Sequence, residues 1–167
     1  MAGRPRATIA AVALVLSLGS SLAAGAACAV PRACAGGIFR ETARRGSVEP
    51  AASPTLRRQR RVEIDFARVF PGGDGRSAAR ATDQLTLNLF PDVCVTAVRD
   101  RATDLGRGQV QWEGHVPGGS PGTATVIVDD GLMVGTIRIA RDVYEIRYLG
   151  DGVHAVTDVD TSSFPRD

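Results

Sequence analysis

The chain has 167 residues, with 20 basic and 18 acidic side chains, a length that suits one ordinary domain. Its hydrophobic fraction of 44% and charged fraction of 23% exclude a fully disordered chain and a multi-span membrane protein. Residues 1–61 carry ten arginines and two acids, whereas residues 62–167 carry ten arginines and sixteen acids. This acidic second part argues against nucleic acid as the main partner.

The first 27 residues are typical of an export signal. Arg4 and Arg6 precede an uncharged apolar run over residues 7–18, and small residues follow at 24–27, where a signal peptidase would cleave. The apolar run is too short to span a bilayer comfortably. Cys28 directly follows the small residues, so a lipid attached to Cys28 is an alternative that would anchor the chain to a membrane. We therefore expect a secreted, periplasmic or cell-envelope protein.

Residues 28–61 contain few large hydrophobic side chains, too few to offset the entropy lost when a backbone becomes ordered. We predict a flexible leader over residues 28–61, followed by a domain over residues 62–167. The leader ends in the sequence RRQRR at residues 57–61, which we interpret as a solvated charge run. A processing site after Arg61 and an electrostatic patch are the alternatives.

The three cysteines are Cys28, Cys34 and Cys94, and an odd number leaves at least one without a partner in the chain. Cys28 and Cys34 could close a small loop, although both fall within the predicted leader. Cys94 lies in an apolar strand. No Cys and His spacing suits a metal ion. We expect that disulfides do not hold this fold together.

Apolar and polar residues alternate with period two from Val62 onward, which predicts β-strands. The expected strands cover residues 62–66, 85–89, 93–98, 110–116, 123–128, 132–139, 143–148 and 153–159. Asp130-Gly131 is typical of a two-residue type I′ hairpin turn, and no helical period of useful length occurs. The predicted fold is all-β, an antiparallel meander that forms a β-sandwich or open half-barrel, preceded by a signal peptide and a disordered leader.

Several strings follow one another in a distinctive order along the predicted domain. They are LTLNLFPDVCVTAV at residues 85–98, WEG at 112–114, GLMVGTIR at 131–138, YEIRY at 144–148, GDGVH at 150–154 and DTSSFP at 160–165. In this order they resemble the N-terminal pro-region of bacterial reprolysin-like zinc metallopeptidases, and the first is similar to that family's LNLFxDVxxTAV segment. The resemblance covers nearly all of residues 62–165, and it implies a pro-region that assists folding of a peptidase and keeps its active-site cleft closed.

The peptidases of that family carry a HExxH helix, in which two histidines bind zinc and a glutamate acts on the bound water. The histidines of this chain are His115 and His154, and neither is followed by Glu-x-x-His. We therefore expect no enzyme activity, no catalytic, cofactor-binding or metal-binding residue and no cofactor. The expected partner is the catalytic domain of a zinc metallopeptidase, for which this chain is an inhibitor, a folding aid or the truncated pro-region of a zymogen.

The other chemically suggestive residues have simpler structural interpretations. A thiolate at Cys94 could occupy the open position of a partner's zinc, but a mid-strand thiol more often packs as a small hydrophobe. Asp129 and Asp130 suit a turn rather than a calcium site, and Trp112 suits a core anchor. The alternative function is a cell-envelope β module, anchored through Cys28, that binds an unrelated protein or a glycan.

Overall fold

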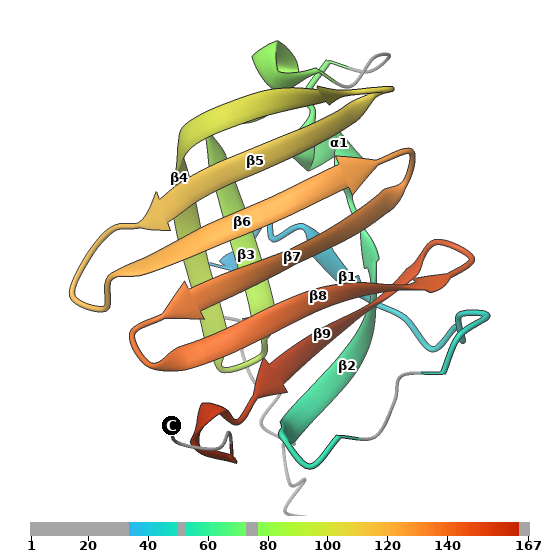
Figure 1. The fold of residues 1–167 in the computed structure, drawn as a ribbon, viewed down its shortest axis with the longest axis vertical. Helices are drawn as coiled ribbons and strands as arrows, with labels where there is room; N and C mark the ends of the chain where they lie inside the picture. Colours follow the sequence, from blue (N-terminus) through green and yellow to red (C-terminus); the bar gives the residue numbers. More distant parts are fainter. Residues whose placement is uncertain (1–33, 50–52, 73–76, 164–167) are drawn as a thin grey trace, which may run out of the picture.

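The computed structural model describes residues 34–49, 53–72 and 77–163. These residues form a nine-stranded antiparallel sheet with one short α-helix and two 3-10 turns (Figure 1). The elements are β1 (Phe39–Glu41), β2 (Leu56–Ile64), α1 (Phe66–Val69), η2 (Ala78–Arg80), β3 (Gln84–Phe90), β4 (Val93–Gly106), β5 (Gln109–Val116), β6 (Gly122–Asp129), β7 (Leu132–Ile139), β8 (Asp142–Gly150), β9 (Val153–Val159) and η3 (Thr161–Ser163).

The strand order is β1-β2-β9-β8-β7-β6-β5-β4-β3, so β3 to β9 form a meander and β2 adds to its last strand. The predicted all-β antiparallel meander is confirmed. The sheet curls further than the expected half-barrel, because its two edge strands β1 and β3 approach each other and nearly close it (Figure 1). At the predicted Asp-Gly turn between β6 and β7, Asp130 and Gly131 have φ values of 31° and 82°, as a type I′ turn requires.

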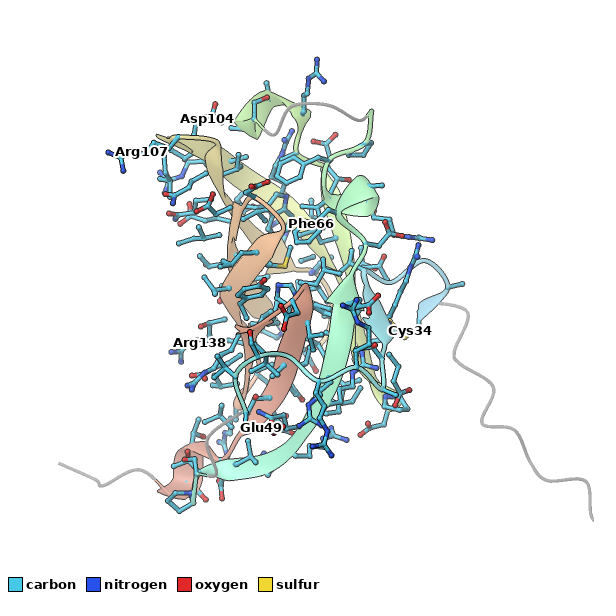
Figure 2. All side chains as sticks on the ribbon, turned by 90° about the vertical axis from the view of Figure 1, so that its right-hand side faces the viewer. Cys34, Glu49, Phe66, Asp104, Arg107 and Arg138 are labelled. Atoms are coloured by element: carbon cyan, nitrogen blue, oxygen red, sulfur yellow. A yellow bond between two sulfur atoms is a disulfide. The ribbon has the colours of Figure 1, made fainter. Side chains whose placement is uncertain are left out.

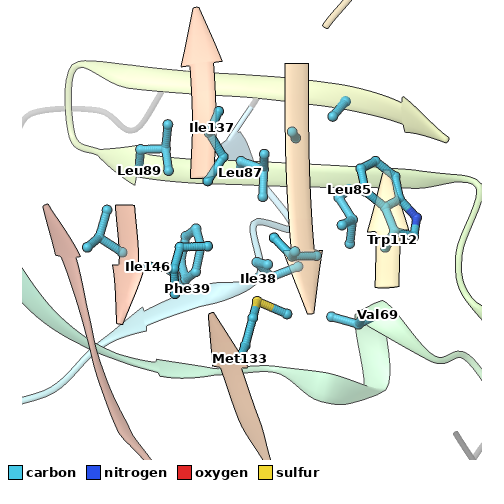
Figure 3. Packing of buried hydrophobic residues seen from close by; sticks show 14 of the residues in the cluster. Ile38, Phe39, Val69, Leu85, Leu87, Leu89, Trp112, Met133, Ile137 and Ile146 are labelled. Atoms are coloured by element: carbon cyan, nitrogen blue, oxygen red, sulfur yellow. The ribbon is translucent and has the colours of Figure 1, made fainter. Parts of the chain in front are cut away.

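Period-two alternation places one set of side chains inside this barrel, and the interior is filled rather than hollow. Leu85, Leu87 and Leu89 of β3 are fully buried, and they pack with Trp112 and Ile137 from strands across the interior (Figure 3). The helix α1 contributes a fully buried Val69 to the same cluster. The hydrophobic core therefore lies between the curled faces of one sheet.

The seam between β1 and β3 is closed by a side chain in place of a regular strand ladder. The Asn88 amide accepts a bond from the Phe39 N–H at 2.9 Å and donates one to the Phe39 carbonyl at 2.7 Å. The Ile38 N–H donates to the Thr86 carbonyl at 3.0 Å. A Cβ at Gly37 would collide with the Asn88 side chain, so glycine is needed there for this close approach.

The prediction of a flexible leader is wrong for the described part of residues 28–61. Residues 39–41 form β1, and residues 56–61 form the first two thirds of β2. The prediction failed because acids distant in sequence neutralise the arginines of β2: Arg57 lies 3.2 Å from Asp160, and Arg58 lies 3.0 Å from Asp158. The charge run is thus part of a strand, and the domain begins well before Val62.

The expectation that no disulfide holds the fold together is also wrong. Cys34 and Cys94 are bonded to each other, with their Cα atoms 5.8 Å apart and 60 positions apart in the sequence. The bond joins the chain just before β1 to β4, beside the seam. Sequence spacing allowed Cys28 as the partner of Cys34, but the curl of the sheet brings Cys94 next to Cys34. Cys28 and the predicted signal peptide lie outside the described residues.

The strand β9 is buried on both faces, unlike the other strands of the sheet, and all seven of its residues are buried. Residues 42–49 cross the outer face of the sheet, where the Val48 N–H donates to the Leu149 carbonyl at 2.8 Å. Figure 2, turned by 90° from Figure 1, shows Glu49 on this crossing segment. Leu149, Val153 and Ala155 form a small second apolar cluster on this outer side. Among the described residues, no helix is long and apolar enough to cross a membrane.

Candidate functional site

A hollow of about 470 Å³ lies on the outer face of β2, β9 and β8, beside the crossing segment. We call it the outer groove. Its floor consists of alternate residues of the three strands, and its rim comes from residues 48–49 and 53–55. The lining residues are Val48, Glu49, Ser53, Thr55, Leu56, Gln59, Glu145, Arg147, Tyr148, Leu149, Ala155, Thr157 and Val159.

The register of the three strands explains how the groove is lined. Gln59 pairs with Thr157, and Thr157 pairs with Glu145, so these residues form one row across the sheet. The Gln59 amide donates to the Thr157 hydroxyl at 3.0 Å. The next row towards the end of β9 is apolar, because Leu56 pairs with Val159. The groove therefore combines an apolar end with a polar middle, a composition common in binding sites.

The charged residues of the groove are neutralised by neighbouring side chains. Glu49 lies 2.8 Å from Arg61, and Glu145 lies 2.5 Å from Arg147. Both pairs are at the protein surface, where an ion pair adds little stability. The lining itself holds two acids, Glu49 and Glu145, and one base, Arg147, whereas Arg61 pairs with Glu49 from outside the groove.

A second polar cluster lies at the end of the barrel where β9 finishes, and its Arg58 and Asp92 side chains are partly exposed. Arg58 bridges Asp92 at 2.7 Å and Asp158 at 3.0 Å, and its guanidinium lies 4.1 Å from the centre of the Phe90 ring. The bond from Arg58 holds the pKa of Asp92 below its usual range. Arg60 also faces inward and donates to the Asn88 carbonyl, and burial lowers its pKa. These contacts hold β2 against β3 and β9, which is a structural role.

The two histidines lie in different surroundings and do not form a common site. His154 is fully buried in β9, where its Nε2 accepts a bond from the Met133 N–H at 3.1 Å. Burial lowers its pKa to about 4, so the ring is neutral at physiological pH. His115 is exposed on β5, with Nδ1 2.6 Å from an oxygen of Asp100. Within the described ranges, no group of three or more His, Cys, Asp or Glu is arranged to hold a metal ion.

The remaining candidates from the sequence have structural roles. Cys94 forms a disulfide, so its sulfur is not available as a thiolate. Trp112 is buried in the core and donates its indole N–H to the Thr82 carbonyl at 2.9 Å, as expected for a core anchor. Asp129 accepts a bond from Gln109 at 2.9 Å beside the β6–β7 turn. None of these residues contributes to the outer groove.

Sequence reasoning missed the outer groove because half of it comes from residues interpreted as a flexible leader. One signal was present in β9: Val153, Ala155 and Val159 occupy positions on the outward face, where a strand exposed on one side carries polar residues. A near-continuous apolar run of this kind is typical of a strand that is covered on both faces.

Comparison with known proteins gives no further guide to this site. No family model, no curated protein and no solved structure matches the chain.

Proposed function

We propose that this chain is an exported, non-catalytic module that resembles a metallopeptidase pro-region and binds the catalytic domain of a zinc metallopeptidase, as an inhibitor or folding aid. The observation that carries the proposal is the order of the family-like strings along one sheet. They occupy β3 with β4, then β5, then β7, β8 and the β8–β9 turn. A resemblance spread in order over one folded unit is stronger support than any single string.

Several of these strings contain residues that the fold requires. A Cβ at Gly114, the glycine of WEG, would meet the Val98 carbonyl and the Trp112 ring. A Cβ at Gly135, within GLMVGTIR, would meet the Thr125 carbonyl. Gly150, at the start of GDGVH, has a φ of 89°. Because these glycines serve packing and turns, the resemblance supports a shared β domain, and the peptidase partner is inferred from that likeness.

The disulfide supports the proposal that the chain is exported. Disulfides form and persist in oxidising compartments such as the periplasm and the extracellular space, and they are rare in the cytosol of mesophiles. The Cys34–Cys94 bond agrees with the export signal expected at residues 1–27.

The same bond favours one mode of inhibition over another. A thiolate that displaces the zinc-bound water must be free, and the Cys94 sulfur is bonded to Cys34. In the proposed complex, the module therefore restrains the peptidase by covering its cleft, through surface contacts between two folded domains.

The proposal is tested by mixing the purified, oxidised chain with a reprolysin-like peptidase from the same organism. We expect binding by calorimetry, together with slower hydrolysis of a reporter peptide or a higher yield of active peptidase after refolding. A matched mixture with an unrelated zinc peptidase of another family controls for non-specific effects. If the chain shows no binding, no inhibition and no effect on refolding, the proposed function is wrong.

A further inference from the structure

We propose that His154 is an acid-sensitive latch between β9 and β7. It holds the end of the β8–β9 hairpin against β7 while the imidazole is neutral, and it releases that end when the ring takes up a second proton. The hairpin end is defined here as residues 148–154, which are the β8–β9 turn and the strand ends beside it. The inference does not depend on the proposed function, because it concerns contacts within this chain.

The ladder between β7 and β8 does not reach the hairpin end. Its last pair is Gly135 with Ile146, so residues 132–134 at the start of β7 have no partner on β8 within the described sheet. The strand β8 continues to Gly150, but its pairing with β9 becomes irregular after Tyr148. Backbone groups of β7 that face β8 at this end therefore need partners of another kind when they are buried.

His154 supplies such a partner from β9, although β8 lies between β9 and β7 in the sheet. Its Nε2 accepts the Met133 N–H at 3.1 Å, and both residues are fully buried. Because Nε2 is the acceptor, the proton of the neutral ring lies on Nδ1. Nδ1 is also buried, and it makes no well-formed hydrogen bond among the described residues. The one strong contact of the imidazole is thus the bond to β7.

This arrangement does not accommodate the charged ring. A second proton would bind Nε2 and point at the Met133 N–H, so two donors would face each other where one bond existed. Burial lowers the pKa of His154 to about 4, and the Gly152 backbone opposes that effect only in part. Uptake of the second proton is therefore coupled to separation of the ring from Met133 and to its exposure to water.

The rings packed against the imidazole offer no charge that would hold the protonated form in place. Phe66 of α1 lies 6.3 Å from the imidazole between ring centres, and Tyr148 of β8 lies 5.1 Å from it. Tyr148 is titratable, and its hydroxyl accepts the Gly152 N–H at 3.3 Å. The charged residue of α1, Arg68, is bonded to Asp65 instead.

The strands and turns around the ring also leave it without a counter-charge. The residue of β2 that pairs with His154 is Val62, which is fully buried. Asp130 and Asp151 lie in exposed turns, and burial together with the Gly152 backbone accounts for the pKa of the ring. The other charged residues of these elements have partners elsewhere: Arg61 with Glu49, Glu63 with Arg44, Arg147 with Glu145, and Asp129 with Gln109.

The size of the response follows from the two pKa values of His154. The closed form has a pKa of about 4, and an open, hydrated ring should have the ordinary value of about 6.5. The closed form is therefore favoured above pH 6.5, and this preference is lost as the pH falls towards 4. The ratio of open to closed molecules should rise up to about 300-fold in total, and about 20-fold between pH 7 and pH 5.

The test is hydrogen exchange of the intact, oxidised chain at pH 7 and pH 5, measured by NMR and expressed as protection factors, which correct for the intrinsic pH dependence of exchange. The amides of Met133 and of the hairpin end should lose protection about 20-fold at pH 5. The amides of Leu85 and Leu87 on β3 should keep theirs. An equal loss at β3 would mean that the whole domain opens, and it would overturn the inference of a local latch.

His154→Gln is the matched variant, because the glutamine amide can accept the Met133 N–H and does not titrate. Its protection at Met133 should not depend on pH. His115→Gln removes the exposed histidine beside Asp100 and should keep the wild-type response. If His154→Gln does not fold, NMR titration of both imidazoles in the wild type decides, because the loss of protection must follow the His154 ring. A response that follows His115 or persists in His154→Gln, or unchanged protection at Met133, would overturn the inference.

Discussion

Removal of the Cys34–Cys94 disulfide should cost this domain a large part of its stability. The bond closes a loop of 60 positions. In the chain-entropy model, a loop of that length lowers the entropy of the unfolded state by about 14 cal/mol/K, which is about 4 kcal/mol at 25 °C. Domains of this size are stable by only about 5–15 kcal/mol, so the double variant Cys34→Ala/Cys94→Ala should keep its fold with a greatly reduced margin.

The assay is thermal unfolding of the oxidised wild type, the wild type with reductant and the double variant, monitored by Trp112 fluorescence. The two forms that lack the bond should agree with each other, and their thermal midpoints should lie roughly 10–15 °C below that of the oxidised form. Hydrogen exchange should accelerate most at Ile38 and Phe39, because the bond anchors the chain just before β1. A double variant as stable as the oxidised wild type would refute the argument from loop entropy.

Three further predictions concern single residues of the barrel. Asn88→Ala should destabilise the fold by about 2–3 kcal/mol in urea unfolding, because both backbone groups of Phe39 lose their partner. Asn88→Asp keeps only the acceptor, so its free energy of unfolding should lie between those of the wild type and Asn88→Ala. His154 has a folded pKa of about 4 against about 6.5 unfolded, so its contribution is full above pH 6.5 and falls by about 3 kcal/mol as the pH drops to 4. Urea midpoints of the wild type should fall as the pH is lowered from 6.5 to 4, and those of His154→Leu should lack this contribution. Trp112→Phe should cost about 2 kcal/mol in the same assay, since the Thr82 carbonyl loses its donor and the core loses volume; a neutral effect would contradict its role as an anchor.

The parts of the fold that could be predicted were those in which local pattern and tertiary environment agree. The alternation of Leu85, Leu87 and Leu89 predicted a strand with one buried face, and β3 has that arrangement. The predictions failed where a residue has a partner far away in the sequence. Arg58 lies in a strand because Asp158 lies beside it, and a single sequence gives no indication of that pairing.

The candidate site was hidden for the same reason. Residues 48–49 and residues between 53 and 59 supply one side of the outer groove, and the composition of the predicted leader indicated a flexible segment. The entropy estimate behind that prediction counted only the apolar residues of the segment itself. It omitted Leu149, Val153 and Ala155, the apolar surface of β8 and β9 on the outer side that this segment crosses.

The sequence by itself determined that the chain forms an antiparallel β meander, where most strands lie and which turn joins β6 to β7, because period-two patterns and turn residues act over a few positions. The tertiary structure decided the extent of the domain, the pairing of Cys34 with Cys94, the closure of the seam by Asn88 and the existence of the outer groove. Each of these depends on contacts between residues far apart in the chain, which form only when the sheet curls and brings its edges together.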